Sequence, residues 1–94
     1  MTLKDKVVVV TGSGGLGSGR AIASRFAREG SFVLVSDINQ EGGFQTVQEI
    51  EQQRGHAAFC RADVRSEEQV HALIAFAERK YGAVSVLINN ASAP

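Results

Sequence analysis

The sequence predicts an α/β fold, a partial, doubly wound parallel sheet in the order β-α-β-α-β-α-β that is truncated after its fourth strand. Strand-like and helix-like segments alternate along all 94 residues. The first of them, Val7–Thr11, is an uninterrupted β-branched run, which is typical of a strand buried on both faces. Such alternation is typical of βαβ units joined by right-handed crossovers. We therefore expect residues 1–94 to belong to a single domain, of which they form the N-terminal part.

Each element follows from its local pattern. The predicted strands are Val7–Thr11, Ser31–Asp37, Ala57–Arg61 and Val84–Asn89. The predicted helices are Ser18–Glu29, Gln40–Arg54 and a third that follows Ser66 and ends at Tyr81. Glycines follow them in the usual helix-ending place, at Gly30, Gly55 and Gly82. Ser66 and Gln69 have the spacing of a capping box, in which each side chain accepts a hydrogen bond from the other's backbone N–H.

Composition argues against several classes of partner. The 10 basic and 10 acidic side chains cancel, so no net field favours nucleic acid or an anionic membrane. The longest purely apolar run, Val7–Val10, is far shorter than the roughly 20 residues of a membrane-spanning helix. The N-terminus lacks the features of a signal peptide, and the single cysteine, Cys60, suits a reducing compartment. We therefore expect a cytoplasmic protein that binds neither nucleic acid nor membrane.

The turn after the first strand, residues 11–19, is rich in glycine and leads directly into a helix. Glycines allow a sharp turn and let the backbone approach a pyrophosphate, which the free N–H groups of the helix N-terminus then bind. Two alternatives remain open. A P-loop shares the spacing of Gly12 and Gly17 but needs Lys and then Ser or Thr where this sequence has Ser18 and Gly19. The turn could also be glycine-rich only because it is tight.

Asp37 ends the second strand, 20 residues after Gly17. A dinucleotide-binding fold places an acid there to accept hydrogen bonds from the adenosine ribose hydroxyls. A carboxylate at this position would repel the additional phosphate of NADP, so the predicted cofactor is NAD. The alternative is that Asp37 is a helix N-cap or turn residue before Gln40.

Two further polar positions follow the third and fourth strands. Asp63 is placed where ligands of open α/β sheets bind, at the carboxyl edge. It could accept a hydrogen bond from an exocyclic amine, or it could only cap a turn. Asn89 and Asn90 end an apolar strand, and their amides can bond either to neighbouring strands or to a ligand.

Taken together, these landmarks resemble those of the short-chain dehydrogenase/reductase family over the whole chain. The matches are the glycine turn running into Arg20-Ala21-Ile22-Ala23, Asp37, Asp63-Val64 and Asn89-Asn90-Ala91. The resemblance implies a Rossmann-type fold and a dinucleotide-binding domain. It implies that the cofactor-binding residues are Gly12, Ser13, Gly15, Leu16, Gly17, Gly19, Asp37, Ile38, Asp63, Val64, Asn90 and Ala91.

The glycine turn departs from the family pattern, which has three residues between its first two glycines and one before the third. In the register that matches Arg20-Ala21-Ile22-Ala23, four residues separate Gly12 from Gly17, an insertion of one. In the other register Gly15-Leu16-Gly17 matches the family's Gly-Ile-Gly, and two residues are additional at the helix start. Ser92 also replaces the last glycine of the family's Asn-Asn-Ala-Gly motif.

Catalytic residues are not expected in this sequence. The family's proton transfer uses a Ser and a Tyr-x-x-x-Lys motif beyond its Asn-Asn-Ala-Gly motif. The only tyrosine, Tyr81, has no Lys four residues on, and His56 and His71 read as surface residues without a catalytic or metal-binding partner.

The resemblance thus implies an NAD(P)-dependent oxidoreductase that interconverts alcohol and ketone, present here as a cofactor-binding fragment. A small-molecule substrate is expected only in a full-length parent, and family members are usually homo-oligomers. The alternative is a non-catalytic truncated product that binds dinucleotide weakly or serves as an interaction module. In either case the fourth strand is expected to expose Val84, Val86 or Ile88.

Overall fold

The structure of the chain is a computed structural model that describes residues 3–12, 14 and 17–90. The described strands are β1 (Val7–Thr11), β2 (Phe32–Asp37), β3 (His56–Arg61) and β4 (Val84–Asn89). The helices between them are α1 (Ser18–Arg28), α2 (Gln40–Gln52) and α3 (Glu67–Tyr81). Every expected element is present in the expected order, with its ends within two residues of the sequence-based bounds.

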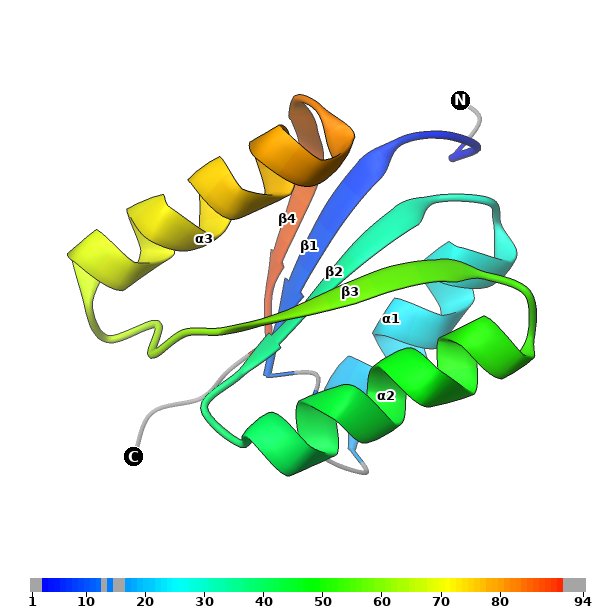
Figure 1. Cartoon of the computed structure of the whole chain (residues 1–94), viewed down its shortest axis with the longest axis horizontal. Helices are drawn as coiled ribbons and strands as arrows, with labels where there is room; N and C mark the ends of the chain where they lie inside the picture. The colour runs from blue at the N-terminus through cyan, green and yellow to red at the C-terminus, as the bar shows by residue number, and fades with distance from the viewer. Residues whose placement is uncertain (1–2, 13, 15–16, 91–94) are drawn as a thin grey trace.

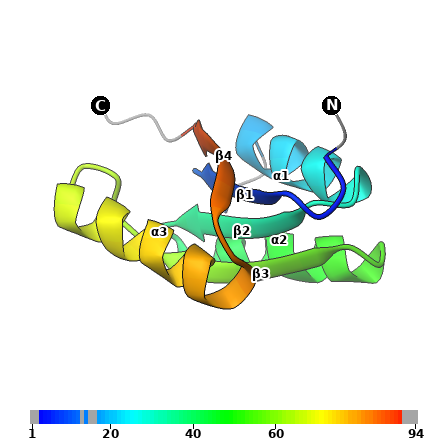
Figure 2. The same ribbon diagram turned by 90° about the horizontal axis from the view of Figure 1, so that it is seen from above.

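All four strands are parallel and form one sheet in the order β3-β2-β1-β4, which Figure 2 shows from β4 at the top to β3 at the bottom. The chain therefore winds outward from β1 to β3 and then returns to place β4 on the other side of β1. The helices α1 and α2 cover one face of the sheet and α3 covers the other (Figure 1). The predicted fold class, a Rossmann-type doubly wound α/β sheet, is confirmed.

The central strands carry the core, as their β-branched sequence requires. Alternate residues of β1 and β2 point to opposite faces, and both faces are buried. On the face of α1 and α2 the buried cluster is Val8, Val10, Ala23, Ala27, Val33, Val35 and Ile50. On the face of α3 it is Val7, Val9, Leu34, Ala62, Leu73 and Ala77. The core thus fixes the strand ends from which the candidate site is built.

The end of α2 differs from the sequence-based expectation. The helix stops at Gln52, and the residue with a left-handed backbone is Arg54 (φ 66°), not Gly55. Gly55 instead lies against the helix, because a Cβ atom there would stand 2.7 Å from Cγ2 of Ile50. Arg54 therefore takes the left-handed place in the helix cap. Gly55 completes that cap, because its N–H donates to the Ile50 carbonyl at 2.9 Å, and its lack of a Cβ atom allows the close packing.

The expectation for β4 was wrong about which apolar residues are exposed. Val84, Val86 and Ile88 are half-buried against the two core clusters. The exposed apolar residue of β4 is Leu87, at 46% exposure, which pairs with Val9 on the face that carries α3. The pairing of β1 with β4 shifts register between Val7, which pairs with Val84, and Val8, which pairs with Val86. Val84 and Val86 therefore pack on opposite faces of the sheet, although they are two residues apart.

Among residues 3–12, 14 and 17–90, no helix is both long and apolar enough to cross a membrane.

Candidate functional site at the carboxyl edge of the sheet

The parallel sheet brings the chemistry-bearing residues of four separate segments to one edge. Gly12, Ile38, Asp63 and Asn90 follow β1, β2, β3 and β4 respectively, and Asp37 is the last residue of β2. This carboxyl edge includes the point where the strand order reverses between β1 and β4, which is where open α/β sheets bind ligands.

Gly12 and Gly19 are glycines because the fold requires them. Gly12 has a left-handed backbone (φ 66°), which a residue with a Cβ rarely adopts. A Cβ atom at Gly19 would collide with the carbonyl oxygen of Gly12 and stand 2.7 Å from Nδ2 of Asn90. Gly19 therefore has the role of the glycine that packs the helix tightly on the strand, which favours the register that continues into Arg20.

Gly17 has a different environment. It is the exposed N-cap of α1, with an extended backbone (φ −89°) that other residues also adopt, and no side chain of the described residues caps this helix end. Among the described residues, none lies within 4 Å of a Cβ atom added to Gly17. Since neither the backbone nor the packing requires this glycine, the open space beside it fits a group that must approach the backbone, as a pyrophosphate does.

The Asp37 carboxylate bonds to two backbone N–H groups. Its Oδ2 accepts from Gly14 N at 3.0 Å, and its Oδ1 accepts from Asn39 N at 2.9 Å. The N-cap of α2 is Asn39, whose Oδ1 accepts from Gly42 N at 3.0 Å. Asp37 is therefore a turn residue but not the helix cap. Because a carboxylate has about four acceptor positions, the contacts with described residues leave one position on each oxygen for a ligand.

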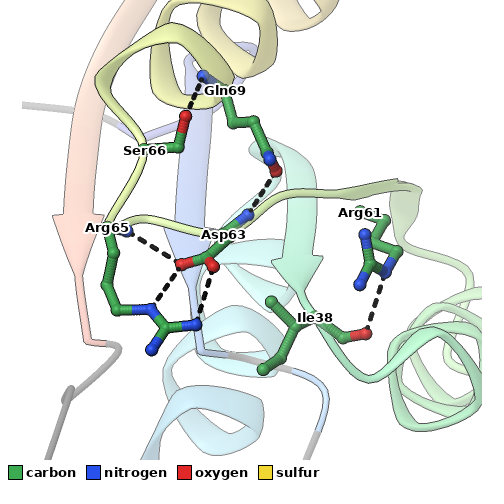
Figure 3. A network of polar contacts seen from close by, with 6 residues as sticks. All are labelled: Ile38, Arg61, Asp63, Arg65, Ser66 and Gln69. Atoms are coloured by element: carbon green, nitrogen blue, oxygen red, sulfur yellow. Dashed lines mark hydrogen bonds and ion pairs between the residues drawn. The ribbon is translucent and has the colours of Figure 1, made fainter.

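Asp63 is engaged by Arg65, which the sequence-based reasoning did not identify (Figure 3). Its Oδ1 accepts from Arg65 N and Nε, both at 3.0 Å, and its Oδ2 accepts from Nη2 at 2.8 Å. These bonds to Arg65 lower the pKa of Asp63 to about 2, so the carboxylate is charged at neutral pH. The described contacts leave about one acceptor position, on Oδ2. Asp63 thus orders its own turn and retains limited capacity for a ligand.

The expected capping box at the start of α3 forms only in part (Figure 3). Ser66 Oγ accepts from Gln69 N at 3.2 Å, as expected. The reciprocal bond was assigned wrongly, because Gln69 Oε1 accepts from Asp63 N at 2.8 Å and not from Ser66 N. The turn explains the difference, since Ser66 N already donates to the Asp63 carbonyl at 3.0 Å. The Gln69 side chain therefore fixes the start of the turn that carries the Asp63 carboxylate.

The segment after β2 adds an apolar surface to this edge. Ile38 is 53% exposed, and its carbonyl accepts from Arg61 Nε at 3.2 Å (Figure 3). Val64 is half-buried beside Asp63 in the chain. An exposed branched aliphatic side chain next to an acid suits a flat apolar ring that carries a polar substituent.

The ends of β1 and β4 are joined by a hydrogen-bond network. The Thr11 hydroxyl donates to the Asn89 amide oxygen at 3.1 Å and accepts from Asn90 N at 3.1 Å. Asn90 Nδ2 donates to the Gly12 carbonyl at 3.4 Å, and Asn90 Oδ1 accepts from Ser18 Oγ at 3.3 Å. Asn90 therefore ties the start of α1 to the strand ends, and Thr11 is a second residue whose role sequence reasoning missed.

Four predicted site residues lie outside the described residues: Ser13, Gly15, Leu16 and Ala91. The described residues contain no group of three or more His, Cys, Asp or Glu side chains that could hold a metal ion. His56 and His71 are exposed, as expected. Cys60 is half-buried in the cluster under α3, and burial raises the pKa of its thiol, in keeping with a core residue.

Comparison with known proteins identifies the family. The family model described as short chain dehydrogenase matches residues 6–94. The chain belongs to the short-chain dehydrogenase family. Members of this family use NAD or NADP as cofactor.

Several individual short-chain dehydrogenases are similar to this chain. The 7alpha-hydroxysteroid dehydrogenase of Escherichia coli (strain K12) is 44% identical over 97% of this chain and 35% of the relative. A probable galactose dehydrogenase of Rhizobium meliloti (strain 1021) is 42% identical over 96% of this chain and 35% of the relative. The crystal structure of hydroxysteroid dehydrogenase from Escherichia coli superposes with a TM-score of 0.92 at 44% identity, covering 97% of this chain and 38% of that one. The chain therefore spans about a third of the length of the curated relatives it matches.

Proposed function

We propose that the chain is the NAD-binding part of a cytoplasmic oxidoreductase that interconverts an alcohol and a ketone. In this proposal the N-terminus of α1 at Gly17 binds the pyrophosphate, Asp37 binds the adenosine ribose, and Ile38, Asp63 and Val64 receive the adenine. The bound nicotinamide supplies hydride transfer, and the residues of this chain hold and orient the dinucleotide.

The observation that carries the proposal is the match between free acceptors and ligand donors at the carboxyl edge. Asp37 has one acceptor position left on each oxygen, and an unmodified adenosine ribose offers two hydroxyl donors. Asp63 has about one position left, which suits a single bond from the adenine amine. Gly17, which has no described neighbour within 4 Å of its Cβ position and no cap from a described side chain, lies on the same edge. NADP would place its 2′-phosphate, in place of a hydroxyl donor, next to the Asp37 carboxylate, and the two negative charges would repel each other.

None of the described residues is assigned to proton transfer. A tyrosine that acts as general acid and base needs a pKa lowered toward neutrality. Burial, and secondarily the charge of Glu51, raise the pKa of Tyr81. The Tyr81 ring also stacks on Phe32 at 5.1 Å, at the amino-terminal end of β2 and away from the site. We therefore propose that this chain binds cofactor and that its parent reaction depends on groups other than Tyr81.

Calorimetric titration of the 94-residue chain with NAD and NADP tests the proposal. We expect NAD to bind at least about tenfold more tightly, a difference of about 1.4 kcal/mol, because the 2′-phosphate of NADP approaches the Asp37 carboxylate. Asp37→Asn keeps the size of the side chain but removes its charge, so the preference should largely disappear. Glu41→Gln, an exposed acid in the first turn of α2, is the matched control and should retain the preference. Equal or reversed affinities of the unmodified chain would contradict the assignment of NAD.

A further inference from the structure

Arg20 makes more side-chain hydrogen bonds to other segments than its place in the first turn of α1 suggests. Its side chain is only 13% exposed. Its Nε donates to Thr46 Oγ1 at 2.8 Å, and its Nη2 donates to the carbonyls of Gly42 at 3.2 Å and Gly14 at 3.3 Å. Nη1 also lies 3.7 Å from Glu49 Oε2. Arg20 therefore joins α1, α2 and the glycine turn through a single guanidinium group.

Gly14 is held on both sides of its peptide backbone. Its N–H donates to Asp37 Oδ2 at 3.0 Å, and its carbonyl accepts from Arg20 Nη2. A Cβ atom at Gly14 would stand 2.8 Å from Cβ of Asp37 and 3.0 Å from Gly43 N, and one at Gly42 would collide with the Gly14 carbonyl. Gly14 thus lies against the first turn of α2, and Arg20 completes that contact.

These contacts indicate that Arg20 does not itself bind the phosphate groups of a ligand. A cation in the first helical turn is unfavourable by itself, because the N-terminus carries the positive end of the helix dipole. Here the donors on Nε and Nη2 are directed at Thr46, Gly14 and Gly42, and Glu49 balances the charge. The guanidinium group is therefore committed to α2 and to Gly14, so we assign the binding of an anion to the backbone N–H groups at the start of α1 and not to Arg20.

We propose that Arg20 is a positioning residue for the cofactor, which acts through Gly14 to keep the glycine turn in the shape that binds a pyrophosphate. The inference rests on the proposed function. Its structural basis is that the Gly14 backbone lies against Gly42 and Gly43 of α2, held there by Arg20 and Asp37.

The test compares two ligands that share the adenosine end of the cofactor. ADP-ribose contains the pyrophosphate, whereas adenosine does not. In Arg20→Met we expect the affinity for ADP-ribose to fall at least about tenfold and that for adenosine to stay within about twofold of the unmodified chain. Arg20→Lys, which retains the charge but not the fork of donors, should recover part of the loss. Arg25→Met is the matched control, because Arg25 lies on the same helix, is exposed and pairs only with Glu29 at 3.1 Å among the described residues.

A purely structural role gives a different result. In that case the melting temperature of Arg20→Met without ligand would be lower than that of the unmodified chain. The folded fraction would then either bind ADP-ribose as tightly as before or lose affinity for ADP-ribose and adenosine equally. Either outcome overturns the positioning role. As a ligand-independent measurement, the amide of Gly14 should exchange at least about tenfold faster in Arg20→Met, relative to the amide of Leu34 in the central sheet. Unchanged relative exchange would also overturn it. An unmodified chain that binds no ADP-ribose would overturn the proposed function itself, whereas binding that survives Arg20→Met would overturn only the role of Arg20.

Discussion

Replacing Gly19 by alanine should lower the free energy of unfolding by about 2–3 kcal/mol. The new methyl group would collide with the Gly12 carbonyl oxygen and press on the Asn90 amide, so α1 must move away from β1. Overpacking usually costs about 1–3 kcal/mol, and a collision with backbone lies at or above the top of that range. The higher helix propensity of alanine offsets about 1 kcal/mol of this cost, and the net loss is then about 2–3 kcal/mol. Thermal denaturation should show a melting temperature lower by roughly 10–20 °C.

Gly17→Ala is the matched control for this measurement. It is the same substitution two residues earlier in the chain, at a position where the methyl group has no neighbour within 4 Å in the described part of the chain and the backbone is extended. Its stability should change by no more than about 1 kcal/mol, the usual cost of alanine at an N-cap. Equal losses for the two variants would show that Gly19 does not have the packing role assigned to it.

Gly17→Ala should in contrast weaken ligand binding while it changes the stability of the chain little. The methyl group would occupy the open space through which a pyrophosphate approaches the start of α1. We expect NAD and ADP-ribose to bind at least about tenfold more weakly, a loss of about 1.4 kcal/mol, while the melting temperature stays close to that of the unmodified chain.

Isothermal titration of the folded variant measures this effect directly. Adenosine is the control ligand, because it has no pyrophosphate, and its affinity should stay within about twofold. If Gly17→Ala bound ADP-ribose as tightly as the unmodified chain, the anion would not be bound at the α1 N-terminus.

Much of the fold could be predicted because its causes are local in the sequence. The β-branched run of Val7–Thr11 identifies a doubly buried strand, and the alternation of strands and helices leads to a parallel sheet. Asp37 and Asp63 could be placed at the carboxyl edge because every parallel strand ends there. Short-range periodicity therefore placed these two acids at one edge of the sheet, and the resemblance to the family supplied the other residues of the candidate site.

The remaining features depend on contacts between distant residues. Arg20 and Thr46 are 26 positions apart, and nothing in the helical pattern around Arg20 indicates that its side chain reaches α2. The roles of three glycines depend on neighbours in the fold: Gly17 faces open space, Gly19 meets the Gly12 carbonyl, and Gly55 meets Ile50. Composition alone makes these positions look equivalent, and only the packing around each one separates a ligand contact from a structural need.

The same limit applies to Asp63. An acid that follows a strand can be predicted either to accept hydrogen bonds from a ligand or to stabilise a turn. The hydrogen bonds from Arg65, two positions later, show that Asp63 stabilises its turn. A basic residue two places after the acid is a signal that could have been used, since an aspartate often bonds to the backbone N–H at that spacing.

The most direct test of the central claim is to locate bound NAD by nuclear magnetic resonance on the ¹⁵N-labelled 94-residue chain. If the carboxyl edge binds the dinucleotide, saturating NAD should shift the backbone amides there, namely those of Gly12, Gly14, Gly17, Asp37, Asp63 and Asn90. The amides at the opposite edge, those of Gly30, Gly55 and Gly82, should stay in place. Shifts confined to that opposite edge, or a spectrum unchanged at saturating NAD, would contradict the proposal that this chain is a dinucleotide-binding unit.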